Sequence, residues 1–136
     1  YFIITDGPPG IGCAAIASVT GTDMVVMVIE ASKSGFHDFQ RAQKLVDSFK
    51  TPIVAVINKH DINKTLTAEI EKYLSELNIP LLAKIPFDKK LVDATTQALT
   101  YPEYQTDDAI TESLRDIVTY LQKPDIYEKK QAQSAS

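Results

Sequence analysis

A carboxylate and a glycine stand four residues apart near the start of the chain, as Asp6 and Gly10 of the segment Asp-Gly-Pro-Pro-Gly. A carboxylate at a strand end can hold a water molecule on Mg²⁺, and a nearby glycine lets a backbone amide approach a terminal phosphate. The pair therefore indicates a place where nucleotide hydrolysis is sensed. The same residues equally allow a structural interpretation, in which Asp6 accepts hydrogen bonds from turn amides and the prolines begin a helix.

A second group of polar residues, Asn58, Lys59, His60 and Asp61, directly follows an apolar run. An Asn amide offers a donor and an acceptor in one plane, which matches the N6 and N7 edge of adenine. An Asp carboxylate instead accepts from the N1 and N2 hydrogen atoms of guanine. Because both residue types are present, the segment indicates a nucleotide without deciding the base. An Asx-type turn capped by Asn58 or Asp61 would account for the same residues.

The third candidate segment is Pro86, Phe87 and Asp88, which follows another apolar run. The proline and the aromatic ring can form one wall of a base pocket, and Asp88 can reach a ribose hydroxyl. Taken alone, the segment favours the simpler interpretation that Asp88 is the N-cap of a helix over Lys89–Ala98.

The elements that must position these residues begin with four short apolar runs rich in β-branched residues. These runs are Phe2–Thr5, Met24–Ile29, Ile53–Ile57 and Leu81–Ile85. Apart from Lys84 they are continuous, which is typical of strands buried on both faces of a parallel sheet. Helical patterns lie between them, so the chain is predicted to be an α/β protein, a parallel sheet with helices on both faces. Ligands bind at the carboxyl ends of the strands in such sheets, and the three segments are therefore expected to share one edge and one nucleotide site.

Amphipathic spacing predicts the helices themselves. One helical face collects apolar residues over Phe36–Phe49, and a second helix begins near Thr67 and ends before Pro80. A last helix is predicted over Asp107–Gln122, and Thr100–Thr106 is predicted to be a loop.

Length and composition predict one domain over residues 1–123 and a polar, disordered tail over residues 124–136. The formal net charge of -4 offers no basic surface for nucleic acid. No apolar run approaches the ~20 residues that a membrane-spanning helix needs. One cysteine, Cys13, cannot form an internal disulfide or hold an iron–sulfur cluster by itself. A cytoplasmic protein is expected, and His37 and His60 lack partners at metal-ligand spacing.

Four segments of the chain resemble the MinD/ParA-type P-loop ATPases, in the branch that carries an inserted ferredoxin domain. The segments are Phe2–Cys13, Glu30–Asp38, Ile57–Asp61 and Ile85–Asp88. The resemblance implies that Asp6 is the ligand of a Mg²⁺-bound water and that Gly10 is the γ-phosphate sensor. It implies ATP and Mg²⁺ as cofactors of the intact protein, and by analogy an iron–sulfur cluster in the insert. A homodimer and a redox or iron–sulfur partner protein are the interactions that it suggests.

The same resemblance assigns the base-binding residues. Asn58 would read adenine within a loop that also includes Lys59 and Asp61, and Pro86 to Asp88 would close over the base and the ribose. Ser34–Asp38 would belong to a surface that responds to a partner or to the nucleotide state.

Two features of this family do not occur in the sequence: a glycine-rich lysine loop, which neutralises the triphosphate, and the cysteine clusters of the ferredoxin insert. We therefore expect the chain to be the C-terminal part of such an ATPase, a partial P-loop fold that does not hydrolyse ATP alone. Its first strand, Phe2–Thr5, is expected to slide against the second strand or to pair with another chain, because its family neighbour is missing. Two alternatives remain open: a GTP-binding relative, favoured by Asp61, and a non-catalytic α/β interaction module.

Overall fold

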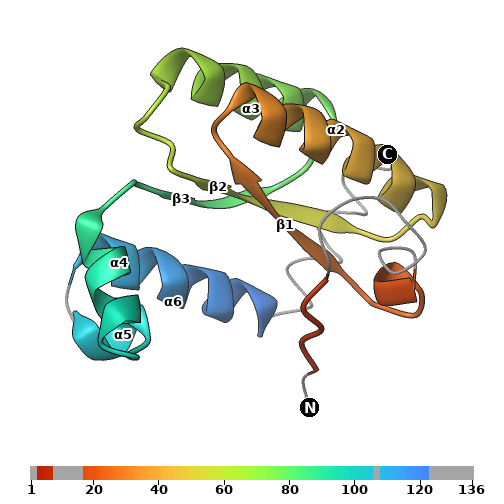
Figure 1. Ribbon diagram of the computed structural model, residues 1–136. Helices are drawn as coiled ribbons and strands as arrows, with labels where there is room; N and C mark the ends of the chain where they lie inside the picture. Colours follow the sequence, from red (N-terminus) through yellow and green to blue (C-terminus); the bar gives the residue numbers. More distant parts are fainter. Residues whose placement is uncertain (1–2, 8–16, 106–107, 123–136) are drawn as a thin grey trace.

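The computed structural model describes residues 3–7, 17–105 and 108–122. In this part of the chain, β1 (Val25–Glu30), β2 (Ile53–Asn58) and β3 (Leu81–Ile85) form a parallel sheet in the order β1-β2-β3. The register pairs Glu30 with Asn58 and Asn58 with Ile85, so the three carboxyl ends are level with one another (Figure 1). The predicted α/β class is confirmed.

The central strand is the most deeply buried element. Every residue of Ile53–Ile57 is buried, and only Asn58, at the carboxyl end, is partly accessible. Continuous burial follows from the position of β2, which has a strand on either side and helices over both faces. The run of apolar β-branched residues therefore suits a strand that is buried on both faces.

Helices α2 (Lys33–Ser48) and α3 (Lys64–Glu76) cover one face of the sheet (Figure 1). Phe39, Ile70 and Leu74 from these helices form one buried cluster with Ile29 and Ile57 from the strands. Burial of this apolar face, rather than helix propensity, is what stabilises helices of this length.

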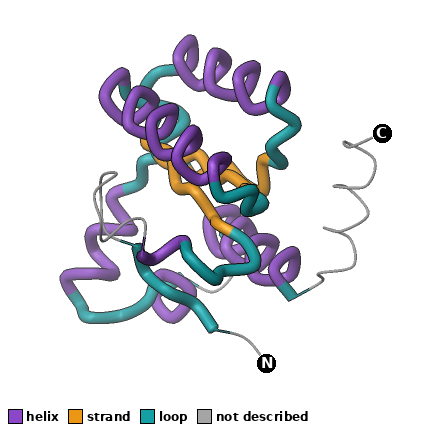
Figure 2. The backbone as a smooth tube through the Cα atoms, turned by 90° about the vertical axis from the view of Figure 1, so that its right-hand side faces the viewer, coloured by secondary structure: helices purple, strands orange, loops and turns teal. Residues whose placement is uncertain are grey.

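The opposite face carries α4 (Lys89–Thr96), α5 (Tyr101–Tyr104) and α6 (Ala109–Leu121), and the three layers are visible in Figures 1 and 2. Ala94, Tyr101 and Ile110 form a second buried cluster, against which Ile85 of β3 packs. Helix α6 lies against β3. On β1, by contrast, Val28 is 67% exposed.

The predicted strand Phe2–Thr5 is not formed in the described residues. Residues 3–7 belong to no strand, and the side chains of Ile3 and Ile4 are exposed. A strand needs a partner for its backbone groups, and no strand of the described sheet pairs with this segment. Within the described residues the segment thus does not slide against the second predicted strand, and the other expectation, pairing with another chain, stays a prediction.

Two helix boundaries differ from the sequence prediction. The N-cap of α3 is Asn63, whose side chain accepts a hydrogen bond from the Leu66 amide, and Thr67 lies inside the helix. The buried Thr67 hydroxyl instead donates a hydrogen bond to the carbonyl of His60 at 2.7 Å, so the Thr67 side chain does not cap the helix. Helix α6 begins after Asp108, which caps it by accepting from the Thr111 amide.

The segment predicted as a loop, Thr100–Thr106, contains a short helix. Pro102 stands in its first turn, and Thr100 forms a capping box with Glu103. Proline tolerates this position because its missing N–H has no partner in a first turn, so the turn signals here begin a helix. None of the helices in the described ranges has the length and hydropathy needed to cross a membrane. The predicted tail, residues 124–136, lies outside the described residues.

Candidate functional site

Two of the three predicted segments meet at the carboxyl edge of the sheet. The ladder between β2 and β3 continues past the strands, because the His60 amide donates to the Ile85 carbonyl at 3.2 Å. The carboxylate of Asp61 then accepts a hydrogen bond from the Phe87 amide at 2.8 Å. The loop after β2 and the loop after β3 are therefore held side by side, as the sequence predicted for parallel strands.

Asn58 ends β2 in a tight turn. Its side-chain oxygen accepts from the Lys59 amide at 3.0 Å, its carbonyl accepts from the Ala31 amide at 3.1 Å, and Lys59 adopts a positive φ of 55°. The Asn58 side chain thus supports the turn through the amide of the next residue, whereas the Asx-type turn anticipated as an alternative would bond the amide two residues on. Among the described residues the Asn58 amide nitrogen has no hydrogen-bond acceptor, so this half-buried donor remains available to a ligand.

Lys59 reaches across to the end of β1. Its Nζ lies 3.4 Å from the Glu30 carboxylate oxygen, and both side chains are about half exposed. Glu30 was not among the predicted site residues. The pair could have been predicted from the sequence, because an acidic residue ends one strand and a lysine directly follows the neighbouring strand.

This ion pair is expected to contribute little to stability. Replacing Glu30 by Gln removes one charge from an accessible pair, and exposed pairs contribute about 0–1 kcal/mol. We expect the free energy of unfolding, measured in urea, to fall by less than about 1 kcal/mol. Glu71→Gln, which removes the similarly exposed pair with Lys84, is the matched comparison. A much larger loss for Glu30→Gln alone would mean that Glu30 has a further structural role.

The loop after β3 exposes an aromatic ring and begins a helix. The Phe87 side chain is 55% exposed, and Pro86 is half-buried beside it. Asp88 is the N-cap of α4 and accepts from the Lys90 amide at 2.8 Å. The structural interpretation of Asp88 is therefore confirmed, and contact with a ribose remains a prediction.

A glycine sets the distance between β1 and α2. The Ser32 side chain caps α2 by accepting from the Gly35 amide at 3.0 Å. A Cβ added at Gly35 would lie 2.5 Å from the Glu30 carbonyl oxygen. Only a glycine lets the first turn of α2 lie this close to the end of β1.

The Asp6 segment does not join this edge. A Cβ added at Gly7 would lie 3.4 Å from Oγ of Ser18, and the next residue, Val19, packs against Val46 and Ile53. These contacts place Asp6 near the amino end of the sheet, away from Asn58, and Figure 1 shows residues 3–7 running away from that end of β1. Gly10 lies outside the described residues, so its role stays a prediction, as does the Mg²⁺ role of Asp6.

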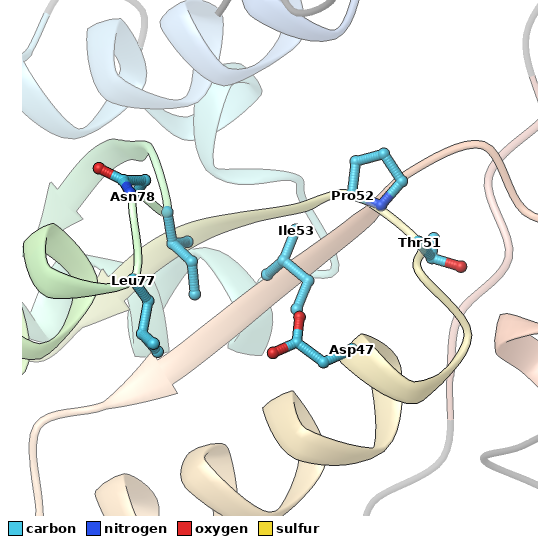
Figure 3. A pocket seen from close by; sticks show the side chains of 7 residues that line it. Asp47, Thr51, Pro52, Ile53, Leu77 and Asn78 are labelled. Carbon is cyan, nitrogen blue, oxygen red and sulfur yellow. The ribbon is translucent and has the colours of Figure 1, made fainter. Parts of the chain in front are cut away.

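A hollow of about 270 Å³ lies at this same amino edge. Its lining comes from the start of β2 and the ends of α2 and α3, including Asp47, Thr51 and Asn78 (Figure 3). Because it is separated from Asn58 by the length of β2, it does not belong to the candidate site. Within the described ranges no group of three or more His, Cys, Asp or Glu side chains is placed to hold a metal ion.

Comparison with known proteins finds distant relatives, three of which are from Methanocaldococcus jannaschii. Identity is 31% with the uncharacterized protein MJ0578, covering 62% of this chain and 27% of the relative, and 27% with MJ0579, covering 74% and 33%. The uncharacterized ATP-binding protein MJ0685 is 24% identical over 68% of this chain and 37% of its own length. The chain thus spans about a third of the length of these curated relatives. No protein-family model matches the sequence.

Proposed function

We propose that this chain supplies the base-binding side of an ATP-binding protein. The observation that carries the proposal is the junction of the two loops at the carboxyl edge, where Asp61 ties the loop after Asn58 to Phe87 and where the Asn58 amide nitrogen has no acceptor among the described residues. An Asn amide fits the adenine edge, and an exposed aromatic ring offers a surface for stacking. The name of one relative, an ATP-binding protein, supports the same ligand class.

The finer parts of the proposal concern the whole protein. We propose a MinD/ParA-type P-loop ATPase. Asp6 lies near the amino edge of the sheet here, so Asp6 and Gly10 would contribute to the Mg²⁺ and γ-phosphate side only if their segment moved to the carboxyl edge when the rest of the sheet is present. Dimerisation and coupling to an iron–sulfur partner belong to this proposal by resemblance only. The glycine-rich lysine loop needed for the triphosphate would come from outside this chain.

Asn58 is the residue on which base binding is tested. We expect Asn58→Ala to weaken binding of ATP about tenfold, which corresponds to roughly 1.4 kcal/mol. Asn58→Asp keeps the oxygen that accepts from the Lys59 amide but loses the amide donor, so it should weaken ATP binding while preserving the turn. The measurement is a titration of the ¹⁵N-labelled chain with Mg-ATP, followed by amide chemical shifts, and of the full-length protein by calorimetry.

The control is Asn78→Gly, at the opposite edge of the sheet. Asn78 has a positive φ of 55°, which glycine accepts, so this change removes an exposed amide without straining the backbone. ATP-induced shifts that avoid the loops around Asn58 and Phe87, or equal ATP affinity for Asn58→Ala and the control, would contradict the proposal.

A further inference from the structure

The contact between Asp61 and Phe87 joins residues that are 26 positions apart in the sequence. It comes directly after the backbone hydrogen bond from His60 to Ile85, where the β2–β3 ladder stops. The Asp61 carboxylate thus adds one more hydrogen bond between the two segments, beyond the last backbone hydrogen bond of the β2–β3 pair. The two loops at the site are tied to each other as well as to their strands.

This contact also determines what the carboxylate of Asp61 can do for a ligand. The Phe87 amide, as the main cause, lowers the pKa of Asp61 below its ordinary value of 3.8, and the nearby charges of His60 and Lys64 act in the same direction. The group is therefore ionised at neutral pH and accepts a charge-assisted hydrogen bond. One oxygen of this carboxylate is bonded to the Phe87 amide, so the side chain is directed toward the neighbouring loop.

We infer that Asp61 is a positioning residue that holds the Phe87 loop against the Asn58 loop, and that it does not itself read the base of a bound nucleotide. This inference rests on the proposed function and names the residue that sets the geometry of that site. It assigns to Asp61 a role different from the base-reading role that its spacing from Asn58 suggests.

The loop contact can be tested without any nucleotide. In the unmodified chain, the Phe87 amide resonance is expected to shift on acidification with a midpoint below 3.8, because the carboxylate loses its charge there. Asp61→Ala should abolish that titration and speed hydrogen exchange at the Phe87 amide by about tenfold. Asp61→Asn keeps an oxygen acceptor and should give intermediate exchange. Unchanged Phe87 exchange in both variants would overturn the positioning role.

The base preference is tested with Mg-ATP and Mg-GTP on the same variants. We expect the unmodified full-length protein to bind ATP at least about tenfold more tightly than GTP. Asp61→Asn should keep ATP affinity within about threefold, whereas Asp61→Ala should lower it about tenfold. Asp116→Asn, a charge-matched change at an exposed position of α6, should leave both affinities unchanged.

The possible results separate the two proposals. A protein that prefers GTP, and loses that preference in Asp61→Asn, would show that Asp61 reads the base and would overturn the inference. If neither nucleotide binds to the unmodified protein, the proposed function fails together with the base preference. In that case the exchange of the Phe87 amide still decides whether Asp61 holds the two loops together.

Discussion

Ile70→Ala is expected to lower the free energy of unfolding by about 2–5 kcal/mol, the range for truncating a fully buried aliphatic side chain. Ile70 is completely buried on α3 and belongs to the cluster that joins α2 and α3 to the sheet. Alanine would remove its apolar contacts and leave a cavity between α3 and the strands, which tightly packed neighbours fill only in part. Urea unfolding followed by far-UV circular dichroism measures the change.

The matched control is the same substitution at Ile62, in the loop after β2. This side chain is 62% exposed, so Ile62→Ala should change the free energy of unfolding by less than about 0.5 kcal/mol. Similar losses for the two variants would mean that α3 does not pack on the sheet in solution as described.

Gly35→Ala is expected to be the second most damaging change, with a loss of roughly 1–3 kcal/mol. In an ordinary helix, alanine in place of glycine would stabilise by about 1 kcal/mol. Here the added Cβ would lie 2.5 Å from the Glu30 carbonyl oxygen and 3.1 Å from the Glu30 Cβ. Backbone cannot rotate away as a flexible side chain can, so the first turn of α2 must move off β1. At this position the substitution is therefore expected to destabilise the protein, although it stabilises an ordinary helix.

Ser34→Ala provides the comparison for this position. It changes the adjacent, exposed residue of the same helical turn and removes only a hydroxyl contact with Ser32 at 3.3 Å. Thermal and urea unfolding of the two variants should therefore differ clearly, with Ser34→Ala close to the unmodified protein. A stabilised Gly35→Ala would mean that the approach of α2 to β1 is looser than described.

The sequence predicted the strands best where each run finds a strand partner in the sheet. The runs Met24–Ile29, Ile53–Ile57 and Leu81–Ile85 agree with β1, β2 and β3 to within one residue at each end, and each of these strands has a partner in the described sheet. The run Phe2–Thr5 has the same composition but forms no strand in its described residues. The composition of a run shows whether it suits a buried strand. Whether it forms a strand also depends on a partner strand within reach, which a local sequence pattern cannot predict.

The candidate site was predictable at the level of loops and not at the level of contacts. That Asn58 and Phe87 lie at one edge follows from parallel strands of known order along the chain. That Asp61 is bonded to the Phe87 amide depends on the path of both loops, including the positive φ of Lys59. The place of Asp6 near the opposite edge was likewise not predictable, because it depends on the strand that failed to form.

The outer edge of β1 has a geometric consequence for any longer form of this polypeptide. Among the described residues nothing pairs with that edge, and Val28 beside it is largely exposed. A parallel strand added there would bring its own carboxyl end level with Glu30, and the turn that follows it would face the loops of Asn58 and Phe87. A strand added on the β1 side of the sheet would therefore place a further loop beside the candidate site.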